Sequence, residues 1–139
     1  MSRRMNEKFM SAYMELDGLC QSKFGLREGG VTEYINRLNN ARIAPRREEA
    51  LPKLVHYRTI RNMIAHEVGA VRRDNGITSR DVSWIRRFSR NIRHKKDPVS
   101  IYLRRARLYL RFRKLRKIAL LIGGILLLAL VITLLIMLL

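Results

Sequence analysis

Apolar residues recur every three or four positions through most of the chain before Asp97, and no segment shows the strict alternation of a half-buried strand. The pattern predicts four helices separated by glycine, proline and asparagine. They are expected over about 6–24, from Thr32 through Leu38, from Pro45 to a stop at Gly69, and from Thr78 past Ile92. Pro52 should either kink the third helix or restart it, because proline lacks a backbone donor and crowds the preceding turn.

The residues that share the apolar face of each helix should form one modest core. Thr78 and Asp81 have the spacing of a capping box at the start of the fourth helix, and Trp84 is expected near the edge of its buried face. The inward positions are Phe9, Ala12, Tyr13, Leu16, Leu19, Cys20 and Phe24, then Tyr34, Ile35 and Leu38, then Leu54, Tyr57, Ile60, Ile64 and Val68, and finally Val82, Ile85, Phe88 and Ile92. We therefore predict an all-α fold in which a small four-helix bundle occupies residues 1–97.

A fifth and much longer helix is predicted after the bundle. Asp97 followed by Pro98 is typical of an N-cap and a first helical position, and no helix breaker follows them before the apolar end of the chain. The helix should run as one rod of about 42 residues. Its first part, residues 98–117, is predicted to be a basic amphipathic segment.

The last 22 residues, Ile118–Leu139, carry no charge, and Leu, Ile and Val fill 16 of these positions. At a rise of about 1.5 Å per residue such a helix reaches roughly 33 Å, which is enough to cross a hydrocarbon core of about 30 Å. A buried core helix is a poor alternative, because the other 117 residues are mostly basic and offer too little apolar surface to surround it. The segment 118–139 is therefore predicted to be a transmembrane helix.

Positive charge is concentrated directly before this apolar run. The formal net charge is +18, every acidic residue lies at or before Asp97, and residues 98–139 hold eight cations and no acid. Because basic flanks stay on the cytoplasmic side and nothing follows Leu139, we expect a tail anchor with the bundle in the cytosol. The single cysteine, Cys20, agrees with a reducing compartment. The eight cations are expected to contact anionic lipid headgroups as well; they are Arg104, Arg105, Arg107, Arg111, Arg113, Lys114, Arg116 and Lys117.

The third predicted helix contains an arginine, a polar residue directly after it, and a histidine after four intervening residues: Arg61, Asn62 and His66. With the hydrophobic helix that leads into it, this motif resembles that of the HEPN superfamily, a set of small helical bundles of which many are metal-independent ribonucleases. The resemblance covers roughly residues 5–95. It implies catalytic roles for these three residues and a homodimer in which two copies of the motif meet. The membrane tail departs from the minimal family pattern.

The residue types suit RNA cleavage. On an ideal helix Arg58, Asn62 and His66 fall within about 80° of one another, opposite the apolar face. Arg58 and Arg61 could bind a phosphate through paired guanidinium donors, and a histidine can exchange a proton near neutrality. In the mechanism that the resemblance implies, neutral His66 takes the proton of a ribose 2′-OH, which attacks the adjacent phosphorus, while Arg61 stabilises the developing charge. Asn62 would orient His66 or the phosphate.

Two classes of function fit the sequence. One is a membrane-tethered, HEPN-like ribonuclease of the toxin or defence type, and the other is a non-catalytic membrane adaptor that binds a protein partner or an anionic polymer. The bare motif spacing also occurs once more, at Arg87 and His94, as an arginine-rich chain can supply by chance. Three widely spaced histidines and one cysteine do not make a metal site, and no glycine-rich phosphate loop is present, so no metal or cofactor is expected.

Overall fold

The computed structural model describes residues 2–67 and 69–138, and this part of the chain is helical without any strand. The predicted all-α fold is confirmed. Val68 and Leu139, which the sequence placed in the third and last helices, lie outside the described residues. The elements are α1 (Ser2–Phe24), α2 (Gly30–Asn40), α3 (Arg47–His66), a short 3-10 turn η1 (Ala70–Arg72), α4 (Ser79–Arg93) and α5 (Pro98–Leu138).

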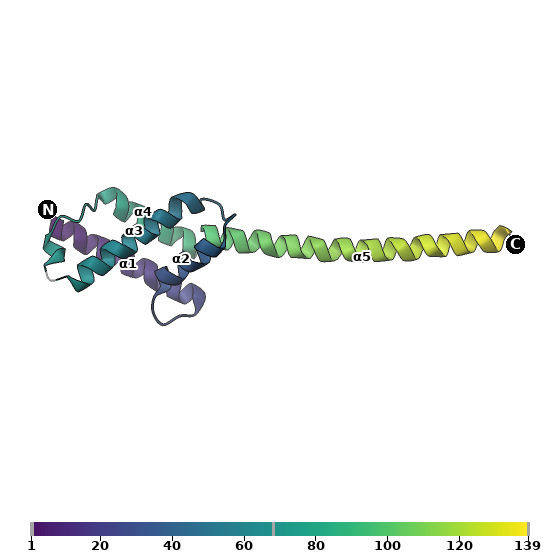
Figure 1. Cartoon of the computed structure of the whole chain (residues 1–139), viewed down its shortest axis with the longest axis horizontal. Coiled ribbons are helices and arrows are strands. Elements are labelled where there is room, and N and C mark those ends of the chain that lie inside the picture. The colour runs from purple at the N-terminus through teal and green to yellow at the C-terminus, as the bar shows by residue number, and fades with distance from the viewer. Residues whose placement is uncertain (1, 68, 139) are drawn as a thin grey trace. The chain divides into compact units, whose positions relative to one another are not determined.

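Helices α1–α4 pack into one bundle (Figure 1). Helix α1 lies against both α2 and α4, and α2 lies against α3. Every inward position that the helical period assigned in α2 and α4 is buried, as are those described in α3 and most of those in α1. Leu19 and Phe24 are half-buried and pack on the same core. The period of the apolar residues therefore predicted the core correctly.

Helix α1 and the start of α2 are in close contact. A Cβ atom added at Gly30 would lie 2.3 Å from the backbone oxygen of Asp17 and 2.5 Å from the backbone nitrogen of Gln21. The Asp17 carboxylate accepts a 2.7 Å hydrogen bond from the Val31 amide. A side chain of α1 thus satisfies a free N–H group at the N-terminus of α2, which Gly29 cannot cap.

Several predicted helix boundaries are wrong by a few residues. Because Asp17 supplies the cap, α2 begins at Gly30, and Thr32 lies inside the helix rather than at its start. The third helix begins at Arg47, after a turn that contains Pro45, and it continues through Pro52 instead of restarting there. It ends at His66, before Gly69, because Glu67 has an extended backbone. Gly69 instead precedes η1 in a left-handed conformation.

The capping box of α4 is confirmed, and Trp84 lies at the edge of the buried face, where it also lines a pocket. Thr78 accepts a hydrogen bond from the Asp81 amide, and Asp81 accepts one from the Thr78 amide. Trp84 is buried at this edge, and its ring stacks on Phe88 at 4.8 Å between centroids. Its indole nitrogen donates to Glu49 of α3 at 3.2 Å. The polar edge of the ring finds a partner on another helix, which allows the ring to be buried.

The N-cap of α5 is confirmed, and it belongs to the core of the bundle. The Ser100 amide donates to the Asp97 carboxylate at 3.1 Å, and Pro98 is the first helical residue. Val99 is buried, and Tyr102 packs against the core. The compact unit that contains the bundle accordingly runs through Tyr102, and a second unit begins at Leu103.

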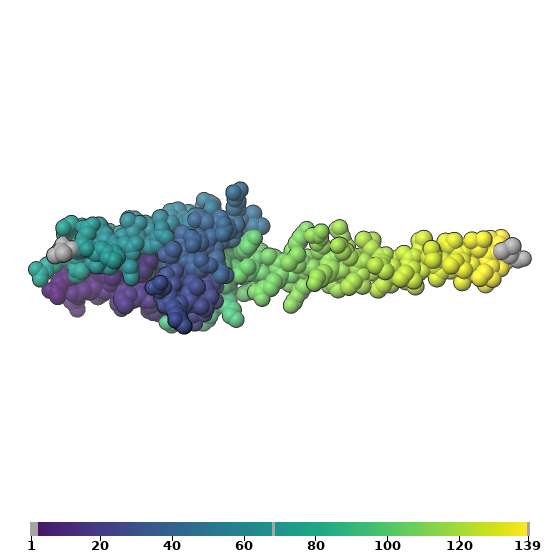
Figure 2. Space-filling model, turned by 60° about the horizontal axis from the view of Figure 1, so that its bottom comes forward, coloured from purple at the N-terminus to yellow at the C-terminus, as the bar shows by residue number. Residues whose placement is uncertain are grey.

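In the second unit, α5 continues as a single helix to Leu138. It is the one helix in the described part of the chain that is long and apolar enough to cross a membrane. None of its most apolar window is buried within the chain, and its side chains are displayed in Figure 2. An uncovered apolar rod of this length is the form that a transmembrane helix takes.

Candidate functional site

Helix α3 carries the motif residues. Glu48 and Glu49 lie in its first turn, where acidic side chains are favoured by the helix dipole, and Leu54, Tyr57, Ile60 and Ile64 hold one face in the core. Arg58 and Arg61 are half-buried, and Asn62 and His66 are exposed. The predicted polar stripe on the outer side of the helix is therefore present.

Arg58, Arg61 and Asn62 line one groove of about 840 Å³, which is bounded also by residues of α1, the loop after it, and α2. The opposite side of the groove carries the acidic residues Asp17, Glu28 and Glu33. Two of these carboxylates are engaged within the bundle: Asp17 binds the Val31 amide, and Glu33 pairs with Arg37 at 2.7 Å. The groove thus presents guanidinium groups on the α3 side and carboxylates on the other.

Tyr13 of α1 also lines this groove. Burial and the nearby Asp17 carboxylate raise the pKa of its phenol above the usual range, although Arg61 and Arg58 act in the opposite direction. The phenol of Tyr13 is therefore a weaker acid than an ordinary tyrosine and lies near the two arginines.

His66 does not line the groove. It is the exposed last residue of α3, and it forms no hydrogen bond or ion pair with the described residues. Asn62 does not orient it either, because the Asn62 side-chain oxygen accepts a 3.1 Å hydrogen bond from Arg61. The structure therefore brings Arg58, Arg61 and Asn62 together and leaves His66 one turn farther along the same stripe.

The family model that matches this chain covers residues 7–119, and its description is "Family of unknown function (DUF6548)". This span is most of the chain. The chain belongs to the DUF6548 family. The matched region holds the bundle and the whole basic segment 98–117, and it ends two residues into the apolar run. No curated protein and no solved structure matched the DUF6548 chain.

The second occurrence of the motif spacing in the DUF6548 chain falls on α4 and does not form a matching site. Arg87 is exposed and lines a different pocket, and His94 is the residue that caps the C-terminus of α4. Neither residue lines the groove that holds Arg61.

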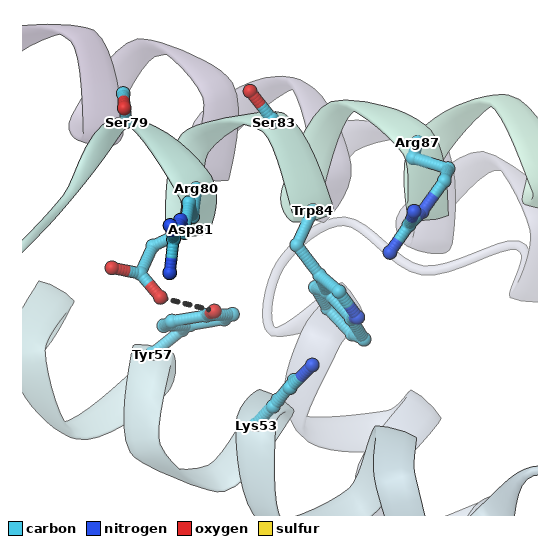
Figure 3. Close-up of a pocket in the computed structure, with 8 residues that line it drawn as sticks. All are labelled: Lys53, Tyr57, Ser79, Arg80, Asp81, Ser83, Trp84 and Arg87. Carbon is cyan, nitrogen blue, oxygen red and sulfur yellow. Dashed lines mark hydrogen bonds between the residues drawn. The ribbon is translucent and has the colours of Figure 1, made fainter.

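That other pocket lies between α3 and α4, has a volume of about 390 Å³, and was not anticipated from the sequence (Figure 3). Its cations are Lys53, Arg80 and Arg87. Tyr57 donates a 2.8 Å hydrogen bond to Asp81 across it. Burial opposes ionisation of Asp81, but hydrogen bonds from Thr78 and Tyr57 outweigh it and lower the pKa of that carboxyl. The sequence feature that could have indicated this pocket is the recurrence of arginine on one side of α4, which includes Arg80 and Arg87.

A buried ionic cluster at the start of α5 was also missed. Asp97 is completely buried, and one of its carboxylate oxygens accepts hydrogen bonds from Lys23 at 2.7 Å and from Tyr34 at 2.7 Å. Its other oxygen has no partner among the described residues. Burial by itself would raise the pKa of Asp97. The hydrogen bonds from Lys23, Ser100 and Tyr34 have the opposite and larger effect, so the pKa of Asp97 is lowered.

The eight cations predicted to contact lipid lie on the DUF6548 chain's last helix, and each is exposed. Tyr109, Phe112, Leu108 and Leu115 are exposed on the same segment. Basic side chains interleaved with aromatic and aliphatic ones are the composition of a helix at a membrane surface. Among the described residues no group of three His, Cys, Asp or Glu side chains could hold a metal ion.

Proposed function

We propose that this DUF6548 protein is a membrane-tethered, HEPN-like endoribonuclease that works without a metal ion. The observation that carries the proposal is the arrangement on α3: Arg61 and Asn62 are hydrogen-bonded to each other at the edge of a groove, and His66 is exposed one turn farther on. A guanidinium that can bind a phosphate and an accessible imidazole are the two groups that the chemistry needs.

In the proposed reaction, neutral His66 accepts the proton of a ribose 2′-OH as that oxygen attacks the adjacent phosphorus. The bond from phosphorus to the 5′-oxygen breaks, and this oxygen takes a proton from water. The products are a 2′,3′-cyclic phosphate and a 5′-hydroxyl end. Arg61 stabilises the charge on the phosphate oxygens, and Arg58, in the same groove, binds the neighbouring phosphate. Asn62 holds the Arg61 guanidinium in position through their hydrogen bond.

We further propose that the active form is a homodimer, as the family resemblance implies. The exposed end of α3 is the face that a second copy would cover. Such pairing would put the His66 of each protomer near the groove of its partner. Within one protomer, His66 does not line the groove.

We also propose that this activity is held at a membrane, with the bundle on the cytosolic side. The proposal rests on the eight cations that precede the apolar part of α5, since basic flanks are retained in the cytosol. Exposed on α5, the same cations would hold the segment against anionic headgroups.

The test is a nuclease assay on a chain that ends at Tyr102, because cutting at Asp97 would remove the buried Val99. Single-stranded RNA should be cleaved in the presence of a chelator, and DNA should stay intact because it lacks the 2′-OH. His66→Ala and Arg61→Ala should abolish cleavage, and Asn62→Ala should weaken it. His94→Ala and Arg42→Ala, both at exposed positions outside the groove, are the matched controls and should leave the rate unchanged.

The second candidate function is a membrane-anchored adaptor without turnover. It is favoured by the acidic side of the groove, where Glu28 and Glu33 face the arginines, and by the exposed Met14 and Leu26 at the same place. Carboxylates repel a phosphate, whereas mixed charge beside apolar groups suits a polypeptide. A well-folded chain that cleaves no RNA but retains a protein partner through the groove would establish this function instead.

A further inference from the structure

The outer face of α4 consists of arginine and serine. Its exposed residues include no acid, and they are Ser79, Arg80, Ser83, Arg86, Arg87, Arg90 and Arg93. The acid of this helix, Asp81, is half-buried and bonded to Thr78 and Tyr57. We call the five arginines of this face the α4 arginine face.

These arginines form one continuous surface. At about 100° per residue they lie within roughly 140° of the helix circumference, and Arg80 and Arg93 are about 20 Å apart along the axis. The apolar residues of α4 occupy the opposite side and are all buried.

Most of this charge is not neutralised inside the bundle. Arg93 pairs with Glu15 of α1. Arg80, Arg86, Arg87 and Arg90 form no side-chain hydrogen bond or salt bridge with the described residues. Like charges at adjacent helical turns repel one another, so the face is destabilising until an anion binds to it.

One edge of the face is hollowed by the pocket between α3 and α4. Figure 3 shows Lys53 and Tyr57 of α3 on one side of it and Arg80 and Arg87 of α4 on the other. Lys53 is already bonded to Glu49 at 3.3 Å, which leaves Arg80 and Arg87 as the guanidinium donors available to a ligand. Ser79 and Ser83 add two hydroxyl groups at the same place, and the Asp81 carboxylate that also lines the pocket is bonded to Thr78 and Tyr57.

From this arrangement we infer that the α4 arginine face binds the phosphodiester backbone of single-stranded RNA, independently of base sequence. The inference rests on the proposed function for the identity of the polymer, but it concerns a different helix from the one that carries His66. Guanidinium groups bind phosphate oxygens with paired donors, and a row of them along a helix matches an extended polyanion rather than a single small anion.

A membrane surface is the other polyanion that a basic helix can meet, and α4 does not have the composition for it. Helices that bind at the lipid interface insert apolar side chains beside their cations. In α4 these side chains, Trp84 and Phe88 among them, are used in the core. In α5, by contrast, Tyr109 and Phe112 are exposed among the cations. The two basic surfaces therefore differ in the anion that they fit.

The test measures RNA binding by the full chain in nanodiscs of neutral phosphatidylcholine, with His66→Ala present so that no RNA is consumed. The probe is a fluorescent oligouridine RNA followed by anisotropy. The triple variant Arg86→Gln, Arg87→Gln, Arg90→Gln is compared with a variant of equal charge loss on α5, Arg111→Gln, Arg113→Gln, Arg116→Gln. Circular dichroism checks that both remain folded, as expected for exposed residues.

The α4 variant should bind at least about tenfold more weakly, and the slope of log affinity against log salt should become shallower by about 2, since each lost phosphate contact contributes about 0.7 for a single strand. The α5 variant should bind RNA as the parent does. Equal losses in both variants, or unchanged binding by a folded α4 variant, would overturn the inference. If the α4 arginine face binds RNA but the nuclease assay shows no cleavage, the proposed ribonuclease function is wrong and the RNA-binding inference stands.

Discussion

The hydroxyl of Tyr34 on α2 donates a 2.7 Å hydrogen bond to the buried carboxylate of Asp97, which lies 63 residues later in the chain. Lys23 of α1 donates to the same oxygen at 2.7 Å. The residue that caps the long helix is thereby bonded to two helices of the bundle. Burial, the Asp97 charge and its hydrogen bond raise the pKa of Tyr34 well above its usual range, so the phenol remains a donor.

Replacing Asp97 should strongly destabilise the bundle. Asp97→Ala leaves the Lys23 ammonium without its buried partner, and the expected loss in the free energy of unfolding is about 3–5 kcal/mol. Asp97→Asn keeps a capping acceptor and should cost less. Urea unfolding of the chain that ends at Tyr102 measures both. The control Arg3→Ala, which removes the exposed pair with Glu7, should change the free energy of unfolding by less than about 1 kcal/mol. If Asp97→Ala and Arg3→Ala lowered the free energy of unfolding equally, the buried cluster of Asp97, Lys23 and Tyr34 would have no special role in stability.

Stability should fall in acid because of the same carboxylate. The pKa of Asp97 is lower in the folded chain than its ordinary value, so its stabilisation is complete above the unfolded pKa of about 3.9 and is lost as the pH falls through the folded value. Unfolding midpoints measured between about pH 6 and pH 2 should decline less steeply in Asp97→Asn than in the parent chain. Asp81 and Glu49, whose pKa values are also lowered, should account for the slope that remains. A parallel decline in both chains would contradict this assignment.

Two glycines should respond to alanine in opposite directions. At Gly30 the added Cβ would meet backbone atoms of α1, so Gly30→Ala should force the helices apart and cost about 1–3 kcal/mol or more. At Gly18, inside α1, an added Cβ meets nothing within 4 Å, and Gly18→Ala should stabilise the helix by up to about 1 kcal/mol. Thermal unfolding of the two variants checks both signs. Similar effects of the two substitutions would be inconsistent with the close packing of α1 on α2.

The apolar end of α5 should make the protein integral to a membrane. The full chain should remain in the membrane fraction through alkaline carbonate extraction, because none of the most apolar window of α5 is buried against the other described residues. The chain that ends at Tyr102 should be recovered in the supernatant. Release of the full chain by alkali would show that α5 is not inserted.

The basic part of α5 should bind anionic lipid. A chain that ends at Lys117 should associate with vesicles that contain phosphatidylserine, and replacing Arg104, Arg105, Arg107 and Arg111 with Gln should weaken the association. Added salt should have the same effect because it screens exposed charges. Cosedimentation measures the bound fraction. Equal binding to neutral vesicles would show that headgroup charge is not the cause.

The sequence by itself determined the helical core and the long apolar helix at the end of the chain. The buried positions of α2, α3 and α4 follow from the spacing of apolar residues, since a helix that buries one face must repeat them every three or four residues. The capping box at Thr78 and the N-cap at Asp97 are local too, because each joins residues within one helical turn. The spacing of Arg58, Asn62 and His66 likewise predicted that they share one stripe.

What only the tertiary structure decided depends on contacts between helices. Asp17 on α1 sets where α2 begins, and Glu49 on α3 allows Trp84 to be buried, although neither partner is near in sequence. The groove that takes in Arg61 but not His66 exists only once α1 and α2 are packed beside α3. A helical period states which side of a helix faces inward. It does not state which side chain of another helix will be there, and hydrogen bonds between helices depend on that placement.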